Sequence, residues 1–508
     1  MITAHTAHAV REAEKPLLAA GEPLMQRAAA ALAHEAGAVL EESRGAVPGA
    51  RVLLLGGPGA NGGDALYAGA RLAEQGARVR ALATHDGLHE EGAAALRSAG
   101  GEIHRVEQAA RPDPADLVVD GILGTGGRPD LDRPLADLLR PIDDLGAPVI
   151  AADVPTGVDA TTGRCDPAAL HATVTVTFGA VKSGLLLPGG ADHAGRIALV
   201  DLGLGPHLPS HPALRRLEQS DVSALWPVPT RADHKYSRGV VTIAAGSTAY
   251  PGAGVLACES AARSGAGMVR YRGPSRVLDL VLSRRPEVVG GEGRSDALVL
   301  GPGLAEQDPR IAAGLEELAA AGSRGVIDAG ALSGIEPGHR FGADVVLTPH
   351  AGEAGRLADA LGCEADQPPA ELAADLARAT GATVLHKGSV TVIAAGSDPE
   401  RRYSQDSGTP YLASAGTGDV LSGIIGTLLA AGLDGPEAAA LGAVIHGRAG
   451  VLASRGGCAP LLALDVARSI PEALAAILAP APEGHPTLYR TESPGSTAPD
   501  GAHPQGGS

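Results

Sequence analysis

The stretch Ser414–Ile425, SAGTGDVLSGII, joins a glycine-rich turn, one acidic residue and an apolar run. Gly416 and Gly418 let the backbone adopt positive φ and turn its N–H groups inward. The apolar run predicts a helix, whose first turn carries unpaired N–H groups and a partial positive charge that attract anions. Asp419 stands where a carboxylate caps a helix or acts as a base. The stretch alone leaves both interpretations open: a capped helix after a tight turn, or an anion-binding loop with a catalytic acid.

The bulk composition limits the class of protein. A chain of 508 residues is too long for one core, so two domains are expected. Hydrophobic residues make up 44% of the chain but aromatic residues only 2%, which favours α/β packing by small aliphatic side chains and disfavours base-stacking surfaces. The net charge of −17 argues against a nucleic-acid partner and against an anionic membrane surface.

The cysteines and the N-terminus indicate the compartment. Cys165, Cys258, Cys363 and Cys458 lie far apart, which suggests neither a zinc site nor a disulfide framework and fits a reducing cytosol. Residues 1–15 contain no apolar signal region, and no apolar run approaches the length of a membrane span. We therefore expect a cytoplasmic protein with no membrane partner.

Polar and glycine-rich loops follow the predicted strands of the first half. After a helical region over residues 6–42, the sequence predicts strands over 51–55, 78–83, 116–120, 148–152, 173–178 and 196–200, with helical stretches between them. Loops at the carboxyl ends of parallel strands gather along one edge of a sheet. Asn61, Asp120, Asp153 and Thr156 should therefore converge there. Their oxygen atoms suit a hard cation, although turns with Asx caps remain the plain alternative.

The second half repeats this pattern after a Pro- and His-rich boundary at 205–211. Strands are predicted over 240–245, 268–271, 297–300, 325–327, 345–347 and 383–385. Helices are predicted over 254–264, after the opening motif, and over 464–478 with a break ahead of Pro471. Lys387 could hold a nucleotide phosphate, and His350 could contact a substrate, although a solitary His or Lys is more often a plain surface residue.

Ordered along the chain, these motifs resemble those of the bifunctional NAD(P)H-hydrate repair enzymes. In the first half the matching stretches are GPGANGGDAL (57–66), VVDGILGTGGR (118–128), AADVPTGVDATTG (151–163) and TVTFGAVKSGLLLPG (175–189). In the second half they are HKYSRGVVTIAAGSTAYPGA (234–253), SGAGMV (264–269), GPGL (301–304), LTPHAGEAGRL (347–357), KGSVTVIA (387–394) and SAGTGDVLSGII (414–425). Single motifs recur elsewhere, but their order is specific.

The resemblance implies an α/β protein of two domains: a Rossmann-like epimerase domain with a parallel sheet over 1–212 and a ribokinase-like dehydratase domain over 220–480. Residues 481–508, rich in Pro, Gly, Ser and Thr, are predicted to be a disordered tail. The implied activity is epimerisation of R- and S-NAD(P)HX and dehydration of the S form to NAD(P)H at the expense of ADP or ATP. The implied partners are NADHX, NADPHX and ADP or ATP, and we expect a homo-oligomer.

The resemblance also implies the site residues. A potassium ion in the epimerase half falls on Asn61, Asp120 and Thr156, and Mg²⁺ is expected in the dehydratase half. The epimerase substrate would contact Ala60, Asn61, Gly62, Gly63, Asp64, Gly124, Thr125, Gly126, Gly127, Arg128, Pro129, Asp130 and Asp153. The dehydratase substrate would contact Ala253, Gly303, His350 and Asp419, and the nucleotide would contact Lys387, Gly388, Ser389, Val390, Thr391 and Gly418.

Catalysis is expected from three acids. Asp419 would be the base of the dehydratase, and either Asp120 or Asp153 would act in epimerisation. The sequence departs from the family at Ala60, where Asn is usual, at Ala65, where Gly is common, and at Thr156, which replaces Ser but keeps the hydroxyl. Two other functions stay open: a ribokinase-like small-molecule kinase, and a first half that only binds ligands or proteins.

Overall fold

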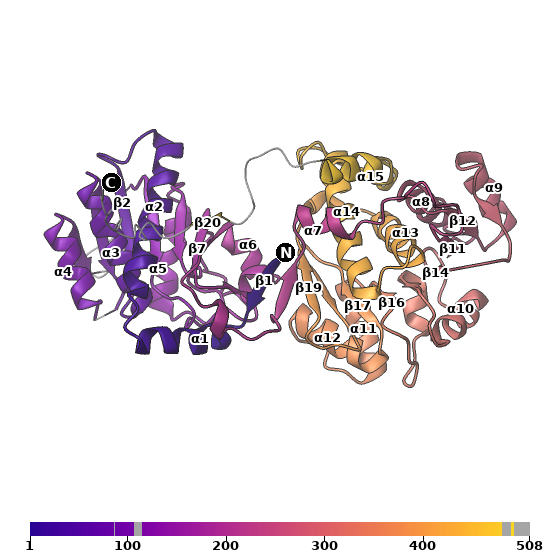
Figure 1. Ribbon diagram of the computed structural model, residues 1–508, viewed down its shortest axis with the longest axis horizontal. Helices are drawn as coiled ribbons and strands as arrows, with labels where there is room; N and C mark the ends of the chain where they lie inside the picture. The colour runs from indigo at the N-terminus through magenta and orange to yellow at the C-terminus, as the bar shows by residue number, and fades with distance from the viewer. Residues whose placement is uncertain (86, 106–113, 480–488, 492–508) are drawn as a thin grey trace, which may run out of the picture.

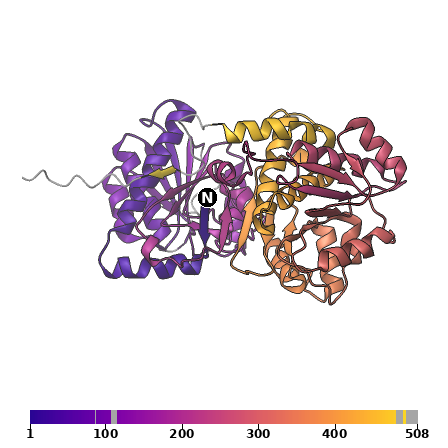
Figure 2. The same cartoon turned by 45° about the vertical axis from the view of Figure 1, so that its right-hand side comes forward.

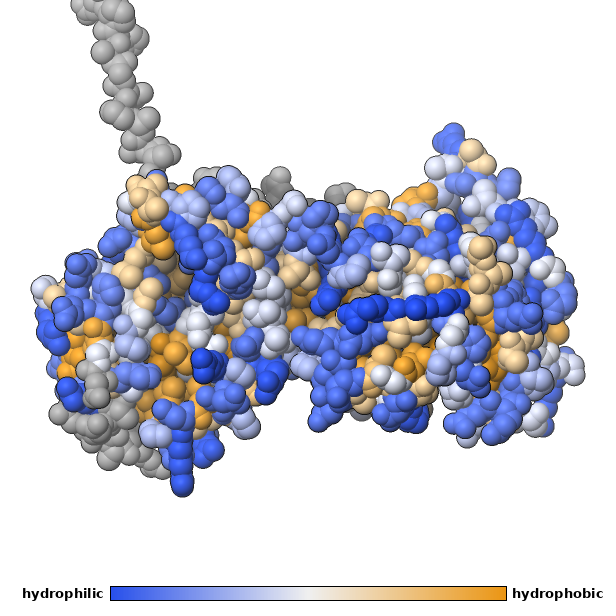
Figure 3. All heavy atoms as spheres, turned by 90° about the horizontal axis from the view of Figure 1, so that it is seen from below, coloured by the Kyte–Doolittle hydropathy of each residue, from blue (hydrophilic) through white to orange (hydrophobic). Residues whose placement is uncertain are grey.

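The computed structural model describes residues 1–85, 87–105, 114–479 and 489–491. It has two α/β lobes side by side, the first built by the N-terminal half and the second by the C-terminal half (Figures 1 and 2). On the face shown in Figure 3, polar and apolar side chains are mixed over both lobes. No helix within the described ranges is long and apolar enough to cross a membrane.

The first lobe contains an eight-stranded sheet in the order β20-β9-β7-β6-β5-β2-β3-β4, with every neighbouring pair parallel. Helices cover both faces, as alternation along β2 requires. Val52 and Leu54 face the core under α2, α3 and α4, whereas Leu53 and Leu55 face α5. The strands are β2 (Arg51–Gly56), β3 (Arg78–Ala83), β4 (Glu102–Arg105), β5 (Leu117–Gly121), β6 (Val149–Ala152), β7 (Val174–Phe178), β9 (Arg196–Val200) and β20 (Tyr489–Thr491), and the helices are α2 (Leu24–Arg44), α3 (Ala60–Glu74), α4 (Glu90–Ser98) and α5 (Arg133–Asp143).

The second lobe is built on a twelve-stranded sheet in the order β13-β12-β11-β14-β15-β16-β17-β18-β19-β10-β1-β8. In this order, every neighbouring pair from β13 to β17 is parallel. Its two faces carry separate cores, one under α8, α13, α14 and α15 and the other under α10, α11 and α12. The strands are β11 (Val240–Ala244), β12 (Met268–Tyr271), β13 (Val289–Gly290), β14 (Ala297–Leu300), β15 (Gly325–Ile327), β16 (Val345–Leu347), β17 (Thr383–His386), β18 (Thr391–Ala394) and β19 (Arg402–Gln405), and the helices are α8 (Pro251–Arg263), α9 (Ser275–Arg284), α10 (Pro309–Ala319), α11 (Ala351–Leu361), α12 (Pro369–Thr380), α13 (Thr417–Ala430), α14 (Gly435–Ala453) and α15 (Ala463–Leu478). The predicted α/β class and alternation of strands with helices are confirmed.

The two lobes share a seam that the sequence did not predict. Strand β10 (Leu214–Arg216) pairs with β19 of the second lobe and with β1 (Ile2–His5), and β1 pairs with β8 (Val181–Lys182) of the first half. Buried Arg216 forms an ion pair with Asp406 and donates to the Leu186 carbonyl oxygen at 2.8 Å. The predicted division at 212–220 surrounds β10, so we propose that β10 belongs to the seam rather than to either domain.

Three local predictions differ from the structure. The helical region at 6–42 is two helices, α1 (Ala7–Ala19) and α2, because Gly21 takes φ 78° and Pro23 follows it. The predicted break ahead of Pro471 is wrong: α15 runs through it, with Ala467, Ile470 and Ala473 packed into the core. Most of the predicted disordered tail lies outside the described residues, but residues 489–491 form β20 beside β9.

The close approach of α8 and α13 generates a stability prediction. A Cβ at Gly423 would lie 2.0 Å from Ser260 Oγ and 2.5 Å from the Ala257 carbonyl oxygen, so Gly423→Ala should destabilise the second lobe by about 1–3 kcal/mol. The matched control is Gly355→Ala in α11, where nothing lies within 4 Å and alanine should stabilise by roughly 0.5–1 kcal/mol. Fluorescence of Trp226, the single tryptophan and a core residue of this lobe, reports the transition. If the two variants changed the free energy of unfolding by the same sign and amount, the proposed close packing of α8 and α13 at Gly423 would be contradicted.

Candidate active sites

In the first lobe, Asp120 and Thr156 are locked together at the carboxyl ends of β5 and β6. Asp120 Oδ2 accepts a hydrogen bond from the Thr156 N–H at 2.7 Å, and Oδ1 accepts from the Thr156 hydroxyl at 2.7 Å. Both side chains are fully buried. Burial raises the pKa of Asp120 to about 6, although the Thr156 donors favour its charged form. The structure therefore brings together two of the three residues predicted to hold potassium.

Asp153 follows β6 with φ 67°, a left-handed conformation that aspartate tolerates better than most residues. Its Oδ1 forms an ion pair with Lys182 Nζ and accepts from the Phe178 N–H at 3.2 Å. Its Oδ2 accepts from the Thr125 N–H at 3.2 Å, which ties it to the loop after β5. Lys182 is fully buried, and its ammonium also donates to the Phe178 carbonyl oxygen at 2.7 Å.

Lys182 is the functional candidate that the sequence analysis missed. A lysine with no exposed surface is rare unless it is paired, and this one closes the ring of groups around Asp153. Its signal in the sequence was a lone cation inside the apolar run TVTFGAVKSGLLL (175–187). Only residues 173–178 were predicted as a strand, so Lys182 was left between two strands, where nothing indicated that it would be buried and would require a buried carboxylate elsewhere in the chain.

Asn61 and Asp64 present buried polar atoms to the same place. Neither amide atom of Asn61 has a hydrogen-bond partner in the described part of the chain, and the same holds for Asp64 Oδ1. A Cβ at Gly124 would lie 3.2 Å from Asn61 Cγ and 3.3 Å from Asp153 Oδ2, so Asn61 and Asp153 meet at Gly124. Burial, followed by the charges of Asp153 and Glu14, raises the pKa of Asp64 well above its ordinary value. Orphaned buried polar atoms of this kind indicate a ligand site.

The remaining predicted residues of this site lie farther out. Ala60 is exposed at the start of α3, and Gly62 and Gly63 are buried within it. Arg128 and Asp130 are exposed in the loop after β5, and Gly126, Gly127 and Pro129 are part of the same loop. Ala65 replaces the common glycine and packs on Gly121, where a second Cβ would come within 2.3 Å.

In the second lobe, the glycine-rich stretch Ser414–Ile425 forms the turn into α13 and the first turns of that helix. Gly416 takes φ 87° at the N-cap, and Asp419 lies in the first helical turn. Asp328, at the carboxyl end of β15, accepts from Lys387 Nζ at 2.9 Å and from the Ser422 hydroxyl at 2.8 Å. A Cβ at Gly418 would lie 3.5 Å from Lys387 Nζ, so the turn, the lysine and Asp328 form one cluster.

The charge of Asp419 is set by this cluster. Burial and the neighbouring carboxylate of Asp328 raise the pKa of Asp419 to about 7, and Lys387 opposes the shift. The Asp328 carboxyl itself has a lowered pKa despite complete burial, because Lys387 and Ser422 stabilise its charged form. Asp328 therefore stays ionised while Asp419 can exchange a proton near neutral pH.

A cavity of about 960 Å³ opens beside this cluster, a size that accommodates a nucleotide. All five residues of the predicted nucleotide segment 387–391 line it, together with Gly418 and His350. His350 caps α11, where its Nδ1 accepts from the Gly352 N–H at 3.1 Å.

The other predicted contacts of the dehydratase substrate, Ala253, Gly303 and Asp419, are not among the residues that line this cavity. Ala253 and Gly303 do lie against each other, since a Cβ at Gly303 would come within 2.6 Å of Ala253 Cβ. Gly416 links Asp419 to the same side, because its Cβ would meet Leu256 of α8 at 2.7 Å and Asp419 Oδ2 at 3.9 Å. Apart from His350, which lines the nucleotide cavity, the predicted hydrate residues thus lie in a neighbouring region.

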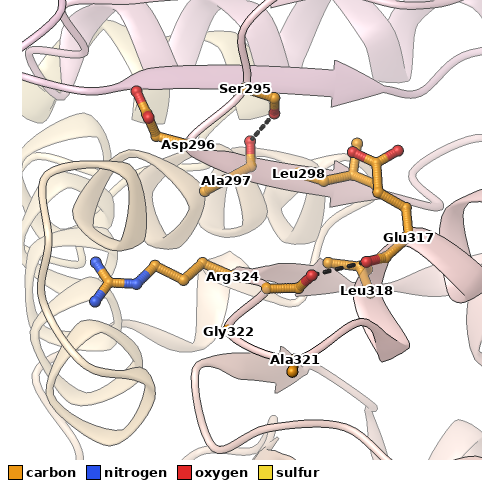
Figure 4. Close-up of a pocket in the computed structure, with 10 residues that line it drawn as sticks. Ser295, Asp296, Ala297, Leu298, Glu317, Leu318, Ala321, Gly322 and Arg324 are labelled. Atoms are coloured by element: carbon orange, nitrogen blue, oxygen red, sulfur yellow. Dashed lines mark hydrogen bonds between the residues drawn. The ribbon is translucent and has the colours of Figure 1, made fainter.

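A second hollow, of about 230 Å³, lies at the opposite edge of the sheet, where β14 and β15 begin (Figure 4). Asp296, Glu317 and Arg324 are among its lining residues. The Arg324 guanidinium forms an ion pair with Asp344 at 3.3 Å and donates to the Leu429 carbonyl oxygen at 3.3 Å. These contacts serve structural roles, and Asp328 and Lys387 of the second-lobe site follow the opposite, carboxyl ends of the strands.

Comparison with known proteins gives the family. A model described as NAD(P)H-hydrate dehydratase matches residues 241–472, and one described as YjeF-related protein N-terminus matches residues 21–184. The bifunctional NAD(P)H-hydrate repair enzyme of Mycobacterium tuberculosis is 42% identical over 447 residues, covering 85% of this chain and 90% of the relative. That of Escherichia coli is 37% identical, covering 84% and 86%. The chain belongs to the family of bifunctional NAD(P)H-hydrate repair enzymes.

Among solved structures, the ADP/ATP-dependent NAD(P)H-hydrate dehydratase of Bacillus subtilis, co-crystallised with ATP and Mg²⁺, is 29% identical with a TM-score of 0.46. The match covers 52% of this chain and 98% of that one.

The buried pair Lys182–Asp153 generates a second prediction. Lys182→Met should destabilise the first lobe by about 3–5 kcal/mol, because it leaves the Asp153 carboxylate buried without its cation. Asp153→Asn should cost a similar amount for the reciprocal reason, and the double variant should cost much less than the sum. Chemical denaturation of the four proteins gives the coupling free energy, expected to exceed 1 kcal/mol. Additivity within about 0.5 kcal/mol would show that the two groups do not interact.

Proposed function

We propose that this protein repairs hydrated nicotinamide nucleotides at two sites. The first lobe epimerises R- and S-NAD(P)HX, and the second dehydrates S-NAD(P)HX to NAD(P)H at the expense of ADP or ATP. The family assignment supports both activities, since the relatives that bear this name match most of the chain. The observation that carries the dehydratase is Asp419, an acid with a pKa of about 7 beside a nucleotide-sized cavity.

In the dehydratase, Asp419 acts as the base. It removes the proton of the C6 hydroxyl as that oxygen attacks the terminal phosphoryl group of the nucleotide, which releases AMP from ADP or ADP from ATP. The C6–O bond then breaks with loss of a C5 proton, which forms the C5=C6 double bond of NAD(P)H and releases phosphate. The Gly418 N–H and the first turn of α13 stabilise the charge of the transferring group, and Lys387 holds the nucleotide phosphates.

Mg²⁺ would neutralise charge on the phosphates and orient them for transfer. Within the described ranges, no group of three or more His, Cys, Asp or Glu residues could hold a metal ion. We therefore assign Mg²⁺ to the nucleotide phosphates rather than to a site made wholly by protein. Asp328 and Glu353, which lie 2.9 Å and 3.8 Å from Lys387 Nζ, are the carboxylates nearest to that lysine and orient it.

In the epimerase, Asn61, Asp120 and Thr156 would hold potassium. The Asn61 amide oxygen fits this role because it is buried without a hydrogen-bond partner in the described part of the chain, and carboxylate, amide and hydroxyl oxygens suit a hard cation. The ion would supply positive charge beside the anionic nucleotide. Asp120 is fully buried and both of its oxygens accept from Thr156, whereas Asp153 Oδ2, although it accepts from the Thr125 N–H, lies against Gly124 of the substrate loop. We therefore assign the proton-transferring role to Asp153, positioned by Lys182.

The base role of Asp419 predicts a specific pH dependence. Because the ionised form is active and its pKa is about 7, dehydration should rise about tenfold per pH unit below neutrality and level off above it. Asp328→Asn removes the negative neighbour and should move this limb to lower pH. Asp419→Asn should abolish turnover yet keep nucleotide binding. Initial rates of NADH formation from S-NADHX across pH check this. Two results would contradict the base role of Asp419: full dehydration activity in Asp419→Asn, or an acidic limb of the pH–rate profile that stays at the same pH in Asp328→Asn.

The cation site predicts an effect on epimerisation alone. Asn61→Ala should slow conversion of purified R-NADHX to the S form by at least tenfold, because it removes the unpartnered oxygen proposed to bind potassium. Chromatography of the two epimers, without any nucleotide, measures the rate in potassium and in a large organic cation. The control is dehydration of S-NADHX by the same variant, which should be unchanged. An epimerisation rate that depends on neither Asn61 nor potassium would exclude the site.

A further inference from the structure

The nucleotide cavity of the second lobe has one wall from the first half of the chain. Ala191 and Asp192 of α6 (Gly190–Ala194) line it, although every other lining residue comes from His350 onward. Figure 1 places α6 at the junction of the two lobes. The seam described above fixes this placement, because Arg216 bonds both the Leu186 carbonyl oxygen, four residues before α6, and Asp406, which also lines the cavity.

The cavity is electrically polarised along its length. Among the described residues that line it, Lys387 is the single lysine or arginine, and it lies beside Gly418 and the first turn of α13. Gln405 lies two strands farther across the sheet: β17 pairs with β18 through His386 and Val392, and Thr391 of β18 pairs with Gln405, the last residue of β19. Asp406 follows, and its carboxylate is already paired with Arg216. Because Arg216 also bonds the Leu186 carbonyl oxygen just before α6, we place Asp192 at the same end as Asp406, the far end, and Lys387 at the other end.

A polar side chain at the far end lacks a partner. Gln405 is 3% exposed and lines the cavity, and neither its amide nitrogen nor its amide oxygen has a hydrogen-bond partner in the described residues. A buried amide without partners is unfavourable, and a ligand with both a donor and an acceptor would satisfy it. The phosphates of a nucleotide are mainly hydrogen-bond acceptors at neutral pH, whereas a nucleoside offers both donors and acceptors.

We propose that the first half of the chain completes the nucleotide site, with the nucleoside at the far end and Asp192 as a specificity-determining residue. This inference rests on the proposed function, which places an adenine nucleotide in the cavity with its phosphates at Lys387. The Asp192 carboxylate accepts a hydrogen bond from a nucleoside donor, either a ribose hydroxyl or the adenine amino group. Gln405 bonds the base beside it. The negative charge at this end also opposes binding in the reversed orientation.

The test is binding of ADP to the full chain by titration calorimetry. Asp192→Ala should weaken ADP binding about tenfold, because a hydrogen bond to a charged group is lost. Asp192 Oδ2 accepts a hydrogen bond from the Gly189 N–H at 3.3 Å at the start of α6. Asp192→Asn keeps an oxygen that can accept this bond, so it serves as the second variant if Asp192→Ala misfolds. It should weaken binding less than Asp192→Ala. The matched control is Glu22→Ala, an exposed acid of the same half, which should bind ADP like the unchanged protein.

Two analogues identify the donor. If the donor is a ribose hydroxyl, 2′-deoxy-ADP should bind the unchanged protein and Asp192→Ala equally. If the donor is the adenine amino group, IDP should instead bind the unchanged protein and Asp192→Ala equally. ADP binding that both Asp192 variants leave within twofold would overturn this inference alone. Absence of ADP binding to the unchanged protein would overturn the proposed function and this inference together.

Discussion

The ion pair between Lys387 and Asp328 is the interaction on which the second site depends. It keeps a fully buried carboxylate ionised, and the charge of that carboxylate helps hold the neighbouring Asp419 at a pKa of about 7. The same lysine lines the cavity and gives it its positive end. The Lys387–Asp328 pair therefore influences both the protonation of the proposed base and the proposed orientation of the nucleotide.

The first lobe uses the same device at the matching place in its sheet. Lys182 and Asp153 form a buried pair after the carboxyl ends of parallel strands, and Asp153 is tied to the loop that follows β5. The two sites differ in what surrounds the pair. Asn61 and Asp64 leave unpartnered polar atoms in the first lobe, whereas the second offers a helix N-terminus and a long cavity. This difference fits the proposed cation and bound nucleotide in the first lobe and the proposed phosphoryl transfer in the second lobe.

Much of the fold could be predicted because the strands are short apolar runs that end in glycine or acidic residues. Asn61, Asp120, Asp153 and Thr156 were expected at one edge for that reason. The structure bonds Asp120 to Thr156 and brings Asn61 and Asp153 together at Gly124. Lys182 was missed because its partner lies 29 residues away in the chain. The seam was missed because β1 and β10 are only four and three residues long, too short to show a period, and their pairing joins opposite ends of the first half.

The central claim is that one chain carries two coupled chemistries, in which epimerisation feeds dehydration. Its most direct test is the time course of near-ultraviolet absorbance after an equilibrated mixture of R- and S-NADHX meets the full chain with ADP or ATP. The account predicts complete recovery of NADH in two phases, a fast one from the S hydrate and a slower one limited by conversion of the R hydrate. Recovery that stops when the S hydrate is consumed, or phosphate ester that accumulates without NADH, would contradict it.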